Sequence, residues 1–419
     1  MKHFFPKAVL LLSCLLLCVL FLGACSNEAQ GKTTKLYVYN WGEYISDGSE
    51  GTVDVNAEFE RWYYDTFGEH VEVVYSTYSS NEDMYAKLSS GTVSYDVIVP
   101  SDYMIERLID EDMLAPLNYD NIPNVKNLFA DFFGKDAVYD YYDKGNVYSV
   151  PYLYGMIGII YNTAMVDEAD IGSWGLMWNE AYRKEGILQF NNPRDAFGTA
   201  QYYLGLDVNS DDEEEWRRAL ELLKAQKDLV QGYVMDEIFN KMENGSAAIA
   251  AYYAGDFLSM YEENEDLDFF YPEEGTNLYI DAMCIPKGSE NKEIAERYID
   301  FMLSVDEEYS APALQNAEYT YYASPNRAVV EDPEYIDYMN EIKDDGYEKM
   351  YGTDGITATP YENLSAEGLI RINSLWEELK SDIDVSPTIY ALVTLIVVGL
   401  VFFIVLFAVK RRTRRKHWQ

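Results

Sequence analysis

The body of this chain alternates short apolar runs with helix-forming segments, and this alternation constrains the fold more than any other feature. Three apolar runs predict β-strands: residues 35–40, 71–76 and 95–100. Helices are predicted after each of them: residues 55–66, 80–88 and 104–111. Strands that alternate with helices favour βαβ units and a parallel sheet. We therefore predict an α/β fold, in which ligands bind where the strands end.

The remainder of the body continues this pattern. Residues 147–161 form a long extended stretch suited to crossing between two lobes, and residues 281–286 predict another strand. Amphipathic or apolar periodicity predicts helices over residues 211–230 and 292–304. A chain of 419 residues is roughly two to three times the usual domain size, so two lobes are expected.

The segments after the first three predicted strands combine aromatic rings with hydroxyl or carboxylate groups. They are residues 40–44, 76–79 and 101–103, and the combination recurs at residues 252–256 and 279–281. Carboxylates bind ammonium groups through charge-assisted hydrogen bonds, and ring faces contact both the methylenes and the charge. The pattern favours an organic cation as ligand. Two alternatives stay open at this point, because exposed loops are polar in most proteins and a carboxylate pair could serve a glycosidase.

Composition excludes several classes of function. The sequence holds 72 acidic and 32 basic residues, a net charge of −40, which repels phosphate backbones and attracts cations. Nucleic-acid binding is therefore not expected. Cys284 is the one cysteine after Cys25, and His70 is the one histidine away from the chain ends. A disulfide within the body and a cysteine-rich metal site are excluded, and a histidine-dependent mechanism would rest on His70 alone.

The N-terminal residues 1–25 read as a lipoprotein signal peptide. Lys2 and Lys7 precede an apolar run, which is typical of secretory signals. The run ends in the sequence Leu-Gly-Ala-Cys at residues 22–25, which resembles the bacterial lipobox and predicts lipidation of Cys25. An ordinary secretory signal with a chance cysteine is the alternative.

The C-terminal residues predict a second membrane attachment. Residues 389–409 are apolar and uncharged, and as a helix they would be about 31 Å long, close to the thickness of a bilayer core. The basic residues 410–416 follow, so we expect a transmembrane helix with residues 410–419 as a cytoplasmic tail and the body outside the cell. A buried core helix is the alternative.

Three segments resemble one known family. Residues 36–44, 74–88 and 95–103 are similar to the spermidine/putrescine-binding proteins, the extracellular solute receptors of ABC polyamine importers. The resemblance extends over residues 36–380. It implies capture of a polyamine such as spermidine or putrescine and its delivery to the permease and ATPase of an ABC transporter. It implies no enzymatic activity, no cofactor and no metal.

The resemblance also implies an architecture. The family has a periplasmic-binding-protein-like fold of type II, in which two α/β lobes are joined by crossover strands and close on the ligand by a hinge. On this basis residues 36–150 and 282–320 are expected in the first lobe. Residues 151–281 and 321–380 are expected in the second.

Ten positions match ligand contacts of the family and are expected to bind the polyamine: Trp41, Tyr44, Ser101, Tyr103, Asn192, Asp195, Tyr252, Tyr279, Asp281 and Tyr322. Asn192 replaces a carboxylate of the family pattern, and Tyr252 and Tyr279 replace tryptophans. Residues 46–68 also look longer than the equivalent family segment. Any of the ten could instead be a core ring, a turn residue or a helix cap.

Three other functions stay open from the sequence. The body could be a receptor for a different small organic cation, or a polyamine sensor that transports no cargo. A surface hydrolase on the same fold would need an acid–base pair, and no motif in the sequence locates one.

Overall fold

The computed structural model describes residues 33–135, 137–353 and 355–381. These residues form two compact units, of which the first extends to Ser365 and the second contains the helix α14 (Ala366–Ser381). Helix α14 carries Ile372, Leu375 and Leu379 at the spacing of one helical face. The sheet and the candidate site belong to the first unit.

The first half of the sheet has the βαβ arrangement predicted from the sequence. Strand β1 (Thr34–Trp41) pairs in parallel with β2 (Val71–Tyr78) and β3 (Val97–Ile98). The helices that follow these strands are α2 (Val55–Phe67), α3 (Asn81–Ser89) and α4 (Asp102–Asp110). The register pairs Trp41 with Tyr78, so the carboxyl ends of β1 and β2 meet at one edge of the sheet.

Side-chain caps set the starts of the first two helices. The Asp54 side chain accepts a hydrogen bond from the backbone N–H of Ala57, and the Ser80 side chain accepts one from that of Asp83. Helix α2 ends at Gly68, whose φ of 72° is the left-handed conformation that glycine adopts most readily.

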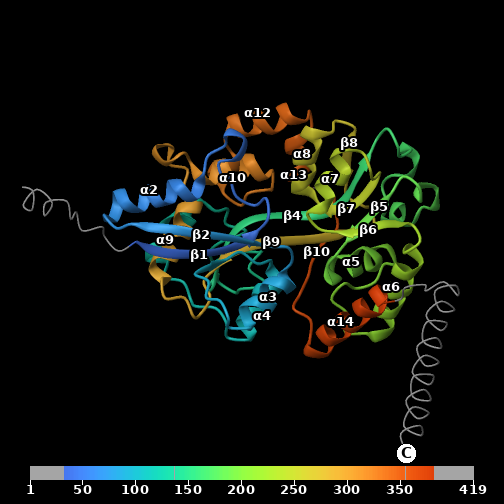
Figure 1. Ribbon diagram of the computed structural model, residues 1–419, viewed down its shortest axis with the longest axis horizontal. Helices are drawn as coiled ribbons and strands as arrows, with labels where there is room; N and C mark the ends of the chain where they lie inside the picture. Colours follow the sequence, from blue (N-terminus) through green and yellow to red (C-terminus); the bar gives the residue numbers. More distant parts are fainter. Residues whose placement is uncertain (1–32, 136, 354, 382–419) are drawn as a thin grey trace, which may run out of the picture. The chain divides into compact units, whose positions relative to one another are not determined.

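Two long antiparallel strands, β4 (Ser149–Asn162) and β9 (Thr276–Cys284), connect the two halves of the sheet. The full strand order is β2-β1-β3-β9-β4-β7-β5-β6. In Figure 1 these two strands run through the middle of the sheet, between the blue strands β1 and β2 and the green and yellow strands β5 to β7. Every residue of β4 except Tyr154 and Gly155 is buried, which accounts for its nearly continuous apolar sequence.

The second half of the sheet has its own strands and covering helices. The strands are β5 (Ile187–Phe190), β6 (Val230–Val234), β7 (Ile249–Tyr253) and β8 (Leu267–Phe270). The helices are α5 (Pro193–Tyr203), α6 (Glu213–Gln226), α7 (Glu237–Glu243) and α8 (Ala254–Glu263). The short strand β10 (Ala358–Pro360) pairs with β9.

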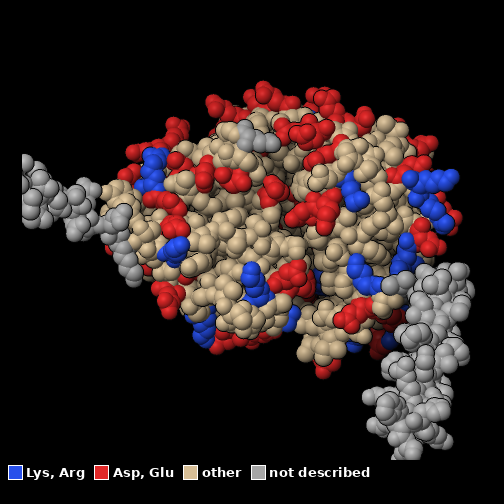
Figure 2. Space-filling view, in the orientation of Figure 1, with Lys and Arg blue, Asp and Glu red and all other residues tan. Residues whose placement is uncertain are grey.

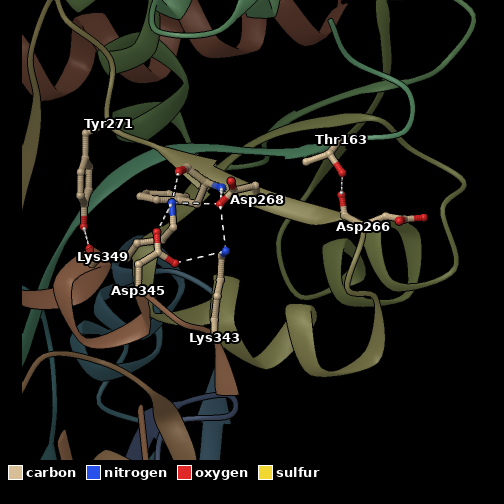
Figure 3. Close-up of polar contacts among 8 residues, drawn as sticks. Thr163, Asp266, Asp268, Tyr271, Lys343, Asp345 and Lys349 are labelled. Carbon is tan, nitrogen blue, oxygen red and sulfur yellow. Dashed lines mark hydrogen bonds and ion pairs between the residues drawn. The ribbon is translucent and has the colours of Figure 1, made fainter. Parts of the chain in front are cut away.

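Five further helices complete the first unit: α9 (Lys292–Met302), α10 (Pro312–Thr320), α11 (Arg327–Val330), α12 (Pro333–Ile342) and α13 (Gly346–Tyr351). An ion-pair cluster fastens the segment of α12 and α13 to β8. Lys349 lies 2.9 Å from Asp268 and 3.4 Å from Asp345, and Lys343 lies 3.2 Å from Asp345 (Figure 3).

The first half of the sheet has an apolar cluster on each face. Leu36 and Val38 of β1 belong to one cluster together with Phe59 of α2. Tyr39, the next residue of β1, points to the other face and joins a cluster with Ile105 of α4. This alternation is the two-residue period of a strand covered on both sides.

The predicted fold class needs one correction. The mixed α/β, periplasmic-binding-protein-like arrangement is observed, but the structure contains no transmembrane helix in the part that it describes. No helix within residues 33–135, 137–353 and 355–381 is long and apolar enough to cross a bilayer. Residues 389–409, which were predicted to form that helix, and Cys25 lie outside the described residues. The division into two lobes at the residues given above stays a prediction.

Candidate functional site

All ten residues expected to bind a ligand line a single narrow cavity of about 60 Å³. Trp41 is the last residue of β1 and Tyr44 lies in the loop that follows, whereas Ser101 and Tyr103 lie at the start of α4. The others come from the start of α5, the end of β7, the centre of β9 and the segment after α10: Asn192, Asp195, Tyr252, Tyr279, Asp281 and Tyr322. Their roles as ligand contacts stay a prediction.

Asp281 lies at the centre of this arrangement and is 4% exposed. Its Oδ2 accepts a hydrogen bond of 2.6 Å from the Tyr44 hydroxyl, and its Oδ1 accepts one of 2.6 Å from the Ser101 hydroxyl. Burial raises the pKa of Asp281 to about 6, although these two hydrogen bonds act in the opposite direction. The carboxylate is therefore oriented by hydroxyl donors without being neutralised by a base.

Asp195 occupies the first turn of α5 and is held by two donors. Its Oδ2 accepts hydrogen bonds of 2.7 Å from the Asn192 side-chain amide and of 2.7 Å from the Tyr253 hydroxyl. Asn192 is also the N-cap of α5 and accepts from the backbone N–H of Asp195. Burial raises the pKa of Asp195, and the two hydrogen bonds, together with the smaller effect of the neighbouring Arg194, only partly oppose this. Arg194 donates instead to the carbonyl oxygen of Val208, so it does not pair with the Asp195 carboxylate.

Asp256, in the first turn of α8, is a third buried carboxylate in the cavity wall. Its Oδ2 accepts a hydrogen bond of 2.8 Å from the Tyr322 hydroxyl. Burial raises the pKa of Asp256 to about 8, and repulsion from Asp236 and Glu43 adds to this. Gly255 gives the Tyr322 ring its space, because a Cβ on Gly255 would lie 2.2 Å from that ring.

Glu82 and Tyr103 form a polar pair at another part of the wall. The Tyr103 hydroxyl donates to Glu82 at 3.0 Å and accepts from the Asn81 side chain at 3.2 Å. Burial raises the pKa of Glu82 as well. Asn81 also donates to the Ser101 hydroxyl at 3.0 Å, which connects this pair to Asp281.

Aromatic rings fill most of the remaining wall. The rings of Tyr44 and Tyr322 meet edge to face, with centroids 4.7 Å apart and an interplanar angle of 87°. Tyr253 and Tyr279 have the same kind of contact at 5.4 Å. The Trp41 indole N–H donates to the carbonyl oxygen of Val99 at 2.9 Å, which fixes this partly exposed ring at the cavity. Carboxylates and ring faces together suit a cation that carries methylene groups.

The charge balance of the cavity differs from that elsewhere in the protein. In the ion-pair cluster of Figure 3, burial would raise the pKa of Asp345, but Lys349 and Lys343 outweigh it and the pKa lies below its usual value. Among the described residues, no Lys or Arg forms an ion pair with Asp281, Asp195 or Asp256. Acidic side chains form several patches on the face in Figure 2 and are densest along its upper edge. The cavity therefore favours a cation supplied from outside the chain.

This chain is similar to bacterial solute-binding proteins over most of its length. The chain matches the model of the bacterial extracellular solute-binding proteins over residues 57–345. It is 30% identical over 380 residues to the putrescine/cadaverine-binding protein of Pseudomonas aeruginosa, which covers 87% of this chain and 98% of the relative. It is 31% identical over 310 residues to the spermidine/putrescine-binding periplasmic protein of Escherichia coli, covering 74% of this chain and 82% of the relative.

This chain belongs to the spermidine/putrescine-binding protein family. The resemblance identified from the sequence is thereby confirmed. A solved structure described as a putative spermidine/putrescine ABC transporter from Listeria monocytogenes has the same fold, with a TM-score of 0.70 and 31% identity over 83% of this chain and 99% of that one. The family is one of solute-binding proteins.

Sequence reasoning missed several residues that line the cavity of this solute-binding protein. Tyr253 and Asp256 were part of the recurring aromatic and carboxylate pattern, so the signal for them was present. Glu82 was included only in the helix predicted over residues 80–88. Tyr361 lies in the segment before Ser365 and is followed by Glu362, so the same combination of ring and carboxylate was present there, but it was not used in the prediction.

Proposed function

We propose that this protein captures polyamines such as putrescine or spermidine in the cavity around Asp281, outside the cytoplasm, and delivers them to the permease of an ABC transporter. One observation carries the proposal: three buried carboxylates, none of them in an ion pair with a described Lys or Arg, face a cavity walled by aromatic rings. The names of the relatives support the ligand class.

The chemistry of polyamines matches each part of this site. An ammonium group donates up to three hydrogen bonds, and a carboxylate whose orientation is fixed by Tyr44 and Ser101 is a strong acceptor for it. The methylenes between two ammonium groups are apolar and pack on ring faces such as those of Tyr279 and Tyr322. Neutral sugars would leave the carboxylates without a counter-ion, so they are poor ligands for this cavity.

Calorimetry on the full-length protein tests the ligand class directly. Putrescine and spermidine should each give saturable binding, and a neutral disaccharide such as maltose should give none. A maltose isotherm without any polyamine signal would overturn the proposal. Binding of an unrelated organic cation with no polyamine signal would keep the cation site but replace the ligand class.

We also propose that Cys25 carries a lipid anchor on the extracellular side of the cell membrane. The support is the sequence Leu-Gly-Ala-Cys at residues 22–25 directly after an apolar run. Cells grown with a clickable fatty acid should label the parent protein, and Cys25→Ala should abolish the label. Equal labelling of both proteins would reject Cys25 as the modified residue.

A further inference from the structure

The wall of the narrow cavity contains buried polar atoms that have no hydrogen-bond partner among the described residues. They belong to Asn277, Tyr279 and Tyr361. An unpartnered polar atom in a protein interior costs free energy, because it has lost its hydrogen bonds to water. Such atoms are rare in native structures, and each one calls for a physical reason. In a cavity wall, a donor supplied by the ligand is one such reason.

The two tyrosine hydroxyls lie against backbone of neighbouring elements. The Tyr279 hydroxyl occupies the space that a Cβ on Gly155 of β4 would take. The Tyr361 hydroxyl occupies the corresponding space at Gly198 of α5. Asn277 therefore remains as the unpartnered group of the wall whose polar atom is available to a ligand.

Asn277 lies on β9, four residues before Asp281, and is 3% exposed. Side chains along a strand alternate between its two faces, so Asn277, Tyr279 and Asp281 share the face that lines the cavity. At 3.2–3.4 Å per residue, the Cα atoms of Asn277 and Asp281 are about 13 Å apart. An extended molecule held at Asp281 can therefore follow β9 past Tyr279 toward Asn277.

The Asn277 amide adds something to the cavity that the carboxylates do not. An ammonium group has three N–H donors, and each of them needs an acceptor when it is buried. Both oxygens of Asp281 already accept from hydroxyl groups, those of Tyr44 and Ser101. The oxygen of Asn277 has two free lone pairs. It can satisfy a donor without adding another buried charge to the free protein.

We propose that Asn277 is a further ligand contact of this cavity, and that its side-chain oxygen accepts a hydrogen bond from an N–H of the polyamine that Asp281 does not bind. This inference rests on the proposed polyamine site and adds a residue to it. The unpartnered amide makes the free protein less stable, and the ligand removes this penalty when it binds. Asn277 thus contributes to affinity through a neutral hydrogen bond.

The variant Asn277→Leu tests the inference, because leucine has a similar shape but no polar atom. Calorimetry with putrescine should give an affinity about threefold to tenfold weaker than that of the parent. The substitution changes no charge, so this loss cannot come from the long-range field of the protein. The melting temperature of the free variant should equal or exceed that of the parent, since a buried unpartnered group is removed. Asn277→Asp keeps an acceptor oxygen, so its putrescine affinity should equal or exceed that of the parent.

Asn162→Leu is the matched control. Asn162 is 4% exposed and does not line the cavity, and its side-chain oxygen accepts a hydrogen bond of 2.9 Å from the backbone N–H of Ala164. This control should melt at a lower temperature and bind putrescine as tightly as the parent. Weaker binding without destabilisation at Asn277, and destabilisation without weaker binding at Asn162, distinguish a ligand contact from a structural role.

Each other outcome has a definite meaning. Putrescine affinity of Asn277→Leu within about 1.5-fold of the parent would overturn the inference, leave the polyamine site intact and assign the amide to an ordered water. Weaker binding together with a lower melting temperature would also overturn it, because Asn277 would then be needed for the fold. Binding more than about threefold weaker in Asn277→Asp would exclude the acceptor role, and this result stands even where the leucine variant does not fold. A parent that bound no polyamine at all would refute the proposed function first.

Discussion

At the scale of single residues, Asp281 combines deep burial with two fixed hydroxyl donors and no basic partner among the described residues. A carboxylate in this situation is unfavourable when ionised, because burial removes its hydration and the hydroxyls only partly replace it. A bound ammonium supplies the missing charge. Under the proposed function, the same residue that makes the free protein less stable at neutral pH would thus attract the ligand.

Replacing Asp281 with Asn should therefore abolish most of the polyamine affinity while leaving the protein folded. Truncating one side of a buried charge pair costs about 2–5 kcal/mol, which is about 30-fold to several thousandfold in affinity. Calorimetry gives the affinity, and a thermal melt confirms folding. Asp300→Asn is the matched control, since Asp300 is also buried with a pKa of about 6 but does not line the cavity. Polyamine binding within twofold of the parent in Asp281→Asn would show that the site is misassigned.

The pKa values of Asp281 and Asp256 predict how binding depends on pH. Because only the ionised carboxylates attract an ammonium, affinity should fall as the pH drops through about 6, where Asp281 becomes protonated. Asp256, with a pKa of about 8, is mostly protonated in the free protein at pH 7, so binding should release a proton there. Calorimetry in buffers of different ionisation enthalpy measures this release. Affinity that is constant from pH 5 to pH 8 would contradict the expectation.

The same shifts have a consequence for the stability of the free protein. Both carboxyls have raised pKa values when folded, so their stabilising protonation is complete below the usual pKa near 4 and is lost as the pH rises through about 6 and about 8. The melting temperature of the free protein should therefore decrease between pH 5 and pH 8. In the double variant Asp256→Asn/Asp281→Asn this decrease should be smaller. A decrease of equal size in both proteins would assign it to other groups.

At the scale of elements, the site depends on strand ends and helix starts that bring side chains to one edge of the sheet. Asp195 and Asp256 both occupy first helical turns, where backbone N–H groups favour a negative charge. Ser101 is bridged to Asp281 through the backbone as well as through its hydroxyl, so α4 and β9 are fixed relative to each other. The site also depends on a small residue where a ring lies against a helix, as Gly255 does beside the Tyr322 ring.

Gly255→Ala should disturb this arrangement without removing any charge. A Cβ at this position would lie 2.2 Å from the Tyr322 ring, so the ring must move and its hydrogen bond to Asp256 must weaken. Overpacking of this kind costs about 1–3 kcal/mol, although Ala by itself favours a helix. We expect a lower melting temperature and weaker polyamine binding. Gly232→Ala is the control, because the nearest atom to its added Cβ is 3.8 Å away.

How far the elements follow from the sequence depends on how local their signals are. The runs 35–40 and 71–76 predicted β1 and β2 well, because apolar periodicity reports burial directly. The run 95–100 forms only the two-residue strand β3, since ladder pairing depends on neighbours far along the chain. The ten site residues could be predicted because they lie in local sequence motifs that resemble the family. The position of Tyr361 in the cavity wall depends instead on how distant segments of the chain pack together.

At the scale of the whole first unit, the cavity draws its wall from both halves of the sheet. Tyr44 and Ser101 belong to the half that contains β1, whereas Asp195 and Asp256 belong to the half that contains β5 and β7. Asp281 lies on β9, which pairs with strands of the first half and with β4. A ligand that contacts all of these residues connects the two halves.

The long-range field of the protein leads to an expectation about binding rates. The net charge of −40 attracts polyamines from a distance, and this attraction is screened over about 10 Å at 0.1 M salt. Contacts inside the cavity are buried and respond much less to salt. Added NaCl should therefore slow association strongly and change dissociation little, and the slowing should be greater for spermine than for putrescine because spermine carries more charge. Stopped-flow measurement of the intrinsic fluorescence, from about 20 mM to about 300 mM NaCl, separates the two rates. If salt acted mainly on dissociation, the attraction would lie in exposed ion pairs at the ligand and not in the field of the acidic surface.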